Sequence, residues 1–265
     1  MNVVRSICHI GVLLIFVVLN ARAAEQRKLH VAAAADLKFA LDELAGRYEK
    51  DSGTKINVTY GSSGNFFSQI QNGAPFDLFL SADSEYPRKL EAAGFAEPGT
   101  LYEYAVGRIV IWMPGNSSID LTAVGWKSLL DARVEKIAIA NPEHAPYGRA
   151  AVAALRRAGI YEQVRAKLVY GENISQAAQF VHSGNAHAGI LALSLAVSPA
   201  MKGGKRWDIP ADMYPRMEQA AVILKSARDK EAARGFLAFL KSQAGRQIIG
   251  KYGFAASSQA GTTMK

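Results

Sequence analysis

Four loops in the sequence could bind an anion, because each combines small or polar residues with the expected start of a helix. At a helix N-terminus, unpaired backbone N–H groups and the positive end of the helix dipole favour negative charge. The four loops are Ala35-Asp36, Ser62-Ser63-Gly64, Ala145-Pro146-Tyr147-Gly148 and Glu172-Asn173-Ile174-Ser175. A plainer interpretation is that Asp36, Ser62 or Ser63, and Asn173 are ordinary N-caps, which by itself predicts no ligand.

Catalytic motifs are missing from the sequence, which contains no G-x-G-x-x-G, G-x-x-x-x-G-K-[ST], H-E-x-x-H or G-x-S-x-G. Gly61-Ser62-Ser63-Gly64 has the wrong spacing for a nucleophile elbow. His144 lies in a loop and could act as a general base, but the sequence identifies no serine or carboxylate partner for it, so loop packing is the favoured interpretation. A hydrolase that uses Asp36 or His144 as base remains an alternative.

The elements that must position these loops alternate between short apolar runs and longer helical patterns, which indicates an α/β fold. The patterns predict strands over residues 29–34, 55–60, 76–81, 109–113, 136–140, 167–170, 188–192 and 220–224. They predict helices over residues 37–52, 65–72, 128–130, 148–158, 175–183, 230–241 and 244–252.

Two series of strands and helices imply two lobes. We place the crossings near residues 102–106 and 218–221, which gives an N-terminal lobe of residues 24–104 plus 220–265 and a second lobe of residues 105–219. Open α/β sheets bind ligands at the carboxyl ends of their strands. Because two of the anion-binding loops fall in each lobe, the ligand is expected between the lobes.

Residues 1–23 have the pattern of an export signal. Arg5 supplies a positive start, residues 10–19 an apolar run and Ala21-Arg22-Ala23 an A-x-A cleavage site. Ten apolar residues are too few for a membrane-spanning helix, which needs about 20. We therefore expect cleavage after Ala23 and a periplasmic protein.

Removal of this segment changes the composition in two useful ways. Cys8 is the only cysteine, so the mature chain has no thiol, and this excludes a disulfide framework, a thiolate zinc site and a cysteine nucleophile. Loss of Arg5 and Arg22 lowers the formal net charge from +8 to +6. The basic residues are scattered and lack an aromatic platform, so we expect no nucleic acid partner and interpret them as a surface that attracts anions.

Five segments, in order, resemble one family. They are VAAAADL (31–37), YGSSGNF (60–66), GAPFDLFLSAD (73–83), NPEHAPYG (141–148) and GRQIIGKYGF (245–254). Together they are similar to the periplasmic molybdate-binding proteins of ABC importers, a branch of the two-lobed solute-binding proteins. The resemblance covers nearly all of the mature sequence.

This resemblance implies a periplasmic-binding-protein fold of type II, in which each lobe is a mixed sheet flanked by helices and the ligand lies in the interlobe cleft. It implies a non-enzymatic, monomeric carrier that delivers molybdate or tungstate to a membrane ABC permease and needs no cofactor and no resident metal. The oxyanion is held by hydroxyl and backbone N–H groups, without a counter-charge. An adhesin or a sensor-domain partner that uses a binding lobe without transport is a further alternative.

Matching the family's motifs residue by residue gives a ligand-binding set of Asp36, Ser63, Tyr147, Ile174 and Ala192. Two of these depart from the family's commonest pattern. Many members have a tyrosine at the position of Ala192, and the Tyr147 phenol is a candidate replacement for that donor. Asp36 stands where serine or asparagine is usual, and an ionised carboxylate cannot donate a hydrogen bond.

Asp36 has two possible fates. In the favoured one its carboxylate caps the N–H groups of Lys38 or Phe39, and only its backbone N–H meets a dianion. In the other it faces the ligand, where like charges repel, so the site would select a different, protonated oxyanion that shares its proton with Asp36.

Overall fold

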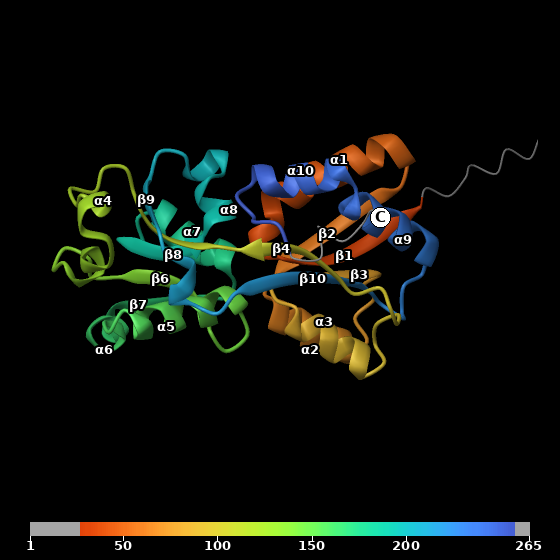
Figure 1. Ribbon diagram of the computed structural model, residues 1–265, viewed down its shortest axis with the longest axis horizontal. Coiled ribbons are helices and arrows are strands. Elements are labelled where there is room, and N and C mark those ends of the chain that lie inside the picture. Colours follow the sequence, from red (N-terminus) through yellow and green to blue (C-terminus); the bar gives the residue numbers. More distant parts are fainter. Residues whose placement is uncertain (1–26, 258–265) are drawn as a thin grey trace, which may run out of the picture.

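The computed structural model describes residues 27–257, and the predicted export signal and its cleavage site lie outside these residues. The described chain forms two five-stranded mixed sheets that lie side by side, each flanked by helices (Figure 1). This arrangement confirms the predicted fold class of two mixed sheets flanked by helices.

The first sheet has the strand order β2-β1-β3-β10-β4. β1 runs parallel to β2 and β3, whereas β10 runs antiparallel to β3 and β4. Its strands are β1 (Lys28–Ala34), β2 (Lys55–Gly61), β3 (Leu78–Ser81), β4 (Tyr102–Gly107) and β10 (Met217–Ile223). Its helices are α1 (Lys38–Ser52), α2 (Ser63–Gln71), α3 (Glu85–Ala92), α9 (Lys230–Lys241) and α10 (Gln243–Lys251), with the 3-10 turn η1 (Ala35–Leu37) before α1.

The second sheet has the order β7-β6-β8-β5-β9, with β6 parallel to β7 and β8, and β5 antiparallel to β8 and β9. Its strands are β5 (Ile109–Met113), β6 (Ile137–Ala140), β7 (Leu168–Gly171), β8 (Ala188–Ala192) and β9 (Lys205–Asp208). Its α-helices are α4 (Leu121–Val124), α5 (Pro146–Arg157), α6 (Tyr161–Val164), α7 (Ile174–His182) and α8 (Leu193–Ala196). Its 3-10 helices are η2 (Gly125–Leu130), η3 (Arg165–Lys167), η4 (Pro199–Met201) and η5 (Ala211–Met213).

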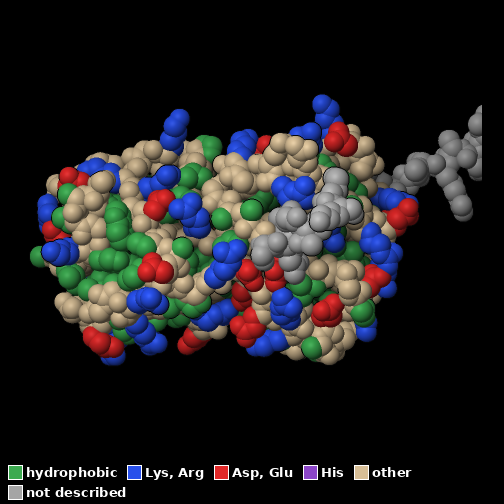
Figure 2. All heavy atoms as spheres, in the orientation of Figure 1, with side chains coloured by type: hydrophobic (Ala, Val, Ile, Leu, Met, Phe, Trp, Pro, Cys, Tyr) green, Lys and Arg blue, Asp and Glu red, His purple; other side chains and the backbone are tan. Residues whose placement is uncertain are grey.

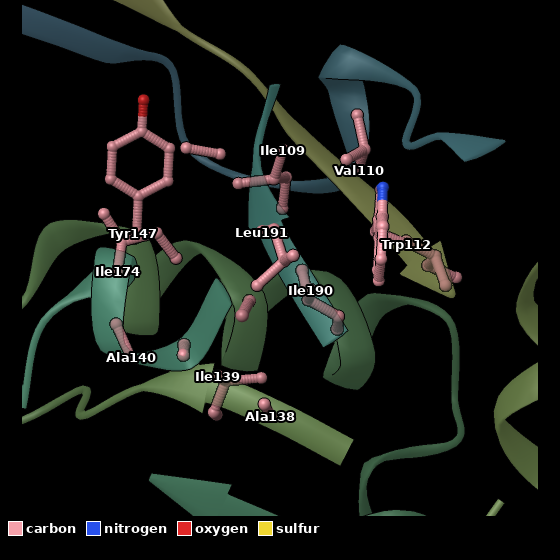
Figure 3. Close-up of a cluster of buried hydrophobic side chains, with 14 of the residues drawn as sticks. Ile109, Val110, Trp112, Ala138, Ile139, Ala140, Tyr147, Ile174, Ile190 and Leu191 are labelled. Carbon is pink, nitrogen blue, oxygen red and sulfur yellow. The ribbon is translucent and has the colours of Figure 1, made fainter. Parts of the chain in front are cut away.

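Each lobe has its own apolar core. In the first lobe, Leu41 of α1 and Phe236 of α9 are fully buried on one face of the sheet, and Phe66 of α2 packs with Phe79 of β3 on the other. In the second lobe the core includes Ile109, Trp112 and many other residues of the second sheet (Figure 3). Strands buried on both faces read as continuous apolar runs, which is why most of them were predictable.

Several elements escaped the sequence analysis for identifiable reasons. β9 has no buried residue and carries Lys205, Arg206 and Asp208, so it lacks an apolar pattern. α3 buries only Pro87 and Leu90. β4 and α8 were also missed, and the helix predicted at residues 128–130 is part of the 3-10 helix η2.

The chain passes between the sheets twice. β4 ends at Gly107 in the first sheet and β5 begins at Ile109 in the second, so the outward passage is very short. The return lies between the end of β9 and the start of β10. The expected lobe boundaries, 104/105 and 219/220, fall inside β4 and β10. Among the described residues, no helix is both long and apolar enough to span a bilayer.

Candidate functional site

A small cavity of about 10 Å³ lies between the lobes, and all four loops singled out in the sequence reach it. It is lined by Ala34, Ala35, Asp36, Gly61, Ser62, Ser63, Ala82, Ala145, Pro146, Tyr147, Asn173 and Ile174. The structure thus brings together Asp36, Ser63, Tyr147 and Ile174 from the predicted ligand-binding set. Ala192, the last residue of β8, is buried but does not line this cavity.

Three helices begin at the cavity, namely α2, α5 and α7. Ser62 caps α2 by accepting a hydrogen bond from the Asn65 N–H (3.4 Å), and Asn173 caps α7 by accepting from the N–H groups of Ser175 and Gln176 (3.0 and 3.1 Å). The N-cap interpretation of Ser62 and Asn173 is therefore confirmed. The caps leave the positive ends of all three helix dipoles directed toward one place.

Ser63 is fully buried, and the position of its hydroxyl suits donation to a ligand. Its Oγ accepts a hydrogen bond from the backbone N–H of Ala82, at 2.9 Å. A hydroxyl that accepts in this way still has its own hydrogen to give. Ser63 can thus be held in place by the protein and donate to an anion at the same time.

Asp36 does not cap the following helix, so the favoured prediction for its side chain was wrong. Leu37 is the N-cap residue of α1, and neither η1 nor α1 has a side-chain cap. The Asp36 carboxylate instead accepts hydrogen bonds at Oδ2 from the Gln219 Nε2 group (2.6 Å) and the Tyr147 hydroxyl (2.9 Å). Asp36 lies in the 3-10 turn η1, which precedes α1. Its side chain bonds to these two donors and not to the N–H groups at the start of α1.

The environment of Asp36 changes its acidity. The residue is 1% exposed, and this burial raises the pKa of its carboxyl to about 6. The hydrogen bonds from Gln219 and Tyr147, and to a smaller extent the nearby backbone N–H groups of Asp36 and Leu37, act in the opposite direction. Its second oxygen, Oδ1, is buried and has no hydrogen-bond partner. Burial of a carboxylate oxygen without a hydrogen-bond partner costs free energy, and Oδ1 is therefore a candidate contact for a ligand in the cavity.

Gln219 is the polar residue that sequence analysis missed. It is fully buried in β10, where its Nε2 group donates to Asp36 and to the Tyr147 oxygen (3.1 Å), and its Oε1 accepts from the Tyr104 hydroxyl (3.0 Å). The only signal in the sequence was an amide between Glu218 and the apolar run AAVIL.

The Tyr147 ring packs in the apolar core of the second lobe, and its hydroxyl belongs to this network. Figure 3 shows its hydroxyl pointing away from the other labelled side chains. Because the phenol has one hydrogen and donates it to Asp36, that hydrogen is already committed in this form of the protein. In this form of the protein the phenol therefore donates to Asp36. This differs from the expectation that it would donate to the ligand in place of the hydroxyl missing at Ala192.

Direct contacts hold the two lobes together around the cavity. The Gly64 N–H donates to the carbonyl oxygen of His144 at 2.8 Å, which joins backbone to backbone across the lobes. Side-chain contacts between the lobes are Ser62 Oγ with His144 Nδ1 (2.9 Å), Asn65 with Glu172 (2.5 Å), Arg149 with Asp83 (2.6 Å), Ser175 with the Ala35 carbonyl (2.9 Å) and Ser194 with the Asp36 carbonyl (2.8 Å). The structure is therefore a closed form.

His144 acquires in the fold the partners that the sequence did not identify. Its ring contacts Ser62 through Nδ1, and its Nε2 lies 3.6 Å from a carboxylate oxygen of Glu172. Both contacts are made at the junction of the lobes, and the His144 carbonyl also accepts the Gly64 N–H. These contacts fit the packing interpretation of this residue.

The cap of α7 gives a stability prediction. Asn173→Ala should lower the free energy of unfolding by about 1 kcal/mol, because two N–H groups lose their acceptor. Urea denaturation of the ligand-free protein measures this change, and Asn173→Asp, which keeps an acceptor oxygen, is the matched control. Equal losses in both variants would contradict the capping role.

The outer surface carries many charged side chains, whereas the cavity lining has a different composition. On the face drawn in Figure 2, lysine and arginine side chains are spread over both lobes, with acidic side chains among them. The cavity lining itself contains no lysine, arginine or histidine. An anion in the cavity would thus be met by dipoles, N–H groups and hydroxyls, and not by a contacting cation.

Comparison with known proteins agrees with this geometry. The profile of the bacterial extracellular solute-binding protein family matches residues 29–255. The molybdate-binding protein ModA of Azotobacter vinelandii is 40% identical over 237 residues, which cover 89% of this chain and 93% of that protein. The molybdate-binding protein ModA of Rhodobacter capsulatus is 38% identical over 223 residues, covering 84% of this chain and 86% of that protein.

A solved structure shares the fold as well. The periplasmic molybdate-binding protein of Azotobacter vinelandii superimposes with a TM-score of 0.82 at 34% sequence identity, covering 87% of this chain and all of that one. With the two mixed sheets, the interlobe cavity and the family profile over most of its length, the chain belongs to the bacterial extracellular solute-binding proteins.

Proposed function

We propose that this protein captures molybdate or tungstate and delivers it to an ABC permease. The observation that carries the proposal is the interlobe cavity, where Ser63 and the starts of α2, α5 and α7 converge without a contacting cation. The molybdate-binding relatives supply the identity of the oxyanion. A hydrogen bond to a charged group contributes roughly 1.5 to 3 kcal/mol, so about six donors can reach the ~12 kcal/mol of nanomolar binding after entropy costs.

The remaining parts of the proposal follow from the same role. The chain is exported by its first 23 residues, works as a periplasmic monomer and catalyses no reaction. Asp36, Ser63, Tyr147, Ile174 and Ala192 form the ligand-binding set, and the two lobes divide near residues 104 and 220. Closure of the lobes completes the site, and the closed form is what the permease recognises.

One observation favours a second candidate, a hydrolase. At the lobe junction the His144 ring lies between Ser62 and Glu172. Its Nδ1 is 2.9 Å from Ser62 Oγ, and its Nε2 is 3.6 Å from a carboxylate oxygen of Glu172. However, Ser62 Oγ already accepts the Asn65 N–H as an N-cap, and Glu172 accepts from the Asn65 amide. These contacts are therefore better explained as hydrogen bonds that hold the two lobes of a transport protein in the closed form. Turnover assays with phosphate and carboxylate esters would separate the two functions.

The mature protein should melt at a higher temperature in the presence of molybdate or tungstate. A ligand that binds only the folded state stabilises it by mass action, by about 2.7 kcal/mol when its concentration is 100 times Kd. Differential scanning fluorimetry measures the shift. An oxyanion concentration of about 100 μM is at least on the order of 100 times Kd for a tight binder.

Sulfate and phosphate are the controls, and each should have little effect at the same concentration. Isothermal titration should then give one oxyanion per chain. Failure of both metal oxyanions to shift the melting temperature would show that the ligand has been assigned wrongly.

A further inference from the structure

Asp36 is an acidic group at a site that we propose binds a dianion. We infer that Asp36 enters the closed, loaded site as a neutral acid and donates a hydrogen bond from Oδ1 to the oxyanion, so that each binding event takes up one proton. This inference rests on the proposed function and adds a role for one residue. It assigns a donor to the position where the family usually has serine or asparagine.

The geometry determines which oxygen can carry the proton. Oδ2 accepts from two donors, the Tyr147 hydroxyl and the Gln219 amide, and so acts as the acceptor oxygen of the carboxyl group. Oδ1 is buried, has no partner and belongs to a residue that lines the cavity. A proton on Oδ1 gives this atom a hydrogen to donate, and the adjacent ligand supplies the acceptor.

The orientation of Gln219 supports this assignment. Its amide nitrogen lies 2.6 Å from Asp36 Oδ2, and its Oε1 lies 3.0 Å from the Tyr104 hydroxyl. The Tyr104 hydroxyl also lies 2.9 Å from the carbonyl oxygen of Ser81, so its one hydrogen is shared between these two acceptors, and this contact ties the network to β3. Gln219 is therefore a positioning residue that holds Oδ2 as an acceptor and leaves Oδ1 for the ligand.

Within residues 27–257, no positive group lies against Asp36 to stabilise its charged form. The side chains that face it are Tyr147 from α5 and Gln219 from β10, with Tyr104 of β4 behind them, while Ser194 of α8 donates to its carbonyl oxygen. The neighbouring charged groups are paired elsewhere: Lys38 with Asp42 on α1, and Arg149 with Asp83 at the lobe junction.

The ionised form would repel the ligand, and the neutral form is accessible. A carboxylate beside a dianion in a cavity without cations is strongly disfavoured, whereas a neutral carboxyl group replaces that repulsion with a hydrogen bond. Burial in the closed form raises the pKa of Asp36 to about 6, and a bound dianion raises it further. Taking the proton from water or from a protonated oxyanion gives the same net stoichiometry.

The sign of the pH dependence follows from this linkage. At the acidic end of the range the Asp36 carboxyl is already protonated before binding, so affinity should not change with pH there. Toward the alkaline end the empty site must gain a proton when it binds, so Kd should rise by up to about tenfold per pH unit. Affinity should therefore be lowest at alkaline pH.

The test uses Asp36→Asn, because asparagine has the shape of a neutral carboxyl group and keeps both an acceptor oxygen and a donor. Tungstate binding is measured by calorimetry at several pH values from 5.5 to 8.5, and at pH 7.5 in two buffers with different ionisation enthalpies. The wild type should take up about one proton per tungstate at pH 7.5. Asp36→Asn should bind without proton uptake, with an affinity that does not depend on pH and that exceeds the wild type's at pH 8.5.

Proton uptake that persists in Asp36→Asn would place the titrating group elsewhere and would overturn the inference. Asp36→Ser, with a hydroxyl donor, is the second variant and should also bind without proton uptake. Wild-type binding with no proton uptake, or folded Asp36→Asn and Asp36→Ser variants that both lose tungstate, would overturn the inference. If the wild type binds neither molybdate nor tungstate at any pH, the proposed function fails instead.

Discussion

A Gly64→Ala protein should lose about ten- to a hundredfold in oxyanion affinity, yet unfold without ligand at nearly the wild-type temperature. An added Cβ would lie 2.6 Å from the His144 carbonyl oxygen and 2.9 Å from its Cα, atoms of the opposite lobe. It would also lie 2.7 Å from the Tyr86 hydroxyl, which is the far end of a side chain and can move. Overpacking of this kind costs roughly 1 to 3 kcal/mol, and here the cost falls on closure.

The open form should tolerate the substitution, because Gly64 lies in the first turn of α2 and alanine favours helices. Calorimetry measures the affinity, and small-angle X-ray scattering with and without ligand reports whether the lobes close. Gly46→Ala in α1 is the matched control, since nothing lies within 4 Å of its added Cβ. Unchanged affinity in Gly64→Ala would mean that the closed form does not bring α2 against His144.

Ser63→Ala is the second substitution with a large expected effect, a loss of tenfold or more in affinity for molybdate or tungstate. The serine hydroxyl has a free hydrogen beside the cavity, and removing one donor to a charged ligand costs about 1.5 to 3 kcal/mol. The same substitution also leaves the Ala82 N–H without its acceptor. The ligand-free protein should therefore be less stable by about 1 to 3 kcal/mol.

The two effects of Ser63→Ala can be separated by measuring urea denaturation of the empty protein and calorimetric affinity independently. Ser68→Ala, in the same helix but outside the cavity lining, is the control and should change neither affinity nor closure. A Ser63→Ala variant that is destabilised but binds normally would make this hydroxyl a structural acceptor only.

The sequence predicted the strands and the anion-binding loops well because both depend on local chemistry. Strands such as β1 and β6 are buried along nearly their whole length, so their apolar runs stand out. Helix caps such as Ser62 and Asn173 act within three residues of their own position. β9 and α3 were missed because their exposed or charged residues carry no such periodic signal.

The sequence by itself determined the fold class, the two lobes and the loops that meet at the cavity. Only the tertiary structure decided the direction of the Asp36 side chain and its partners, because these depend on groups that lie 111 and 183 positions away in the chain. The same is true of Gly64, where a side chain has no room only because His144 approaches from the other lobe. Local propensity cannot contain such information, since burial, hydrogen bonding and pKa at the cavity are set by groups that folding brings from both lobes.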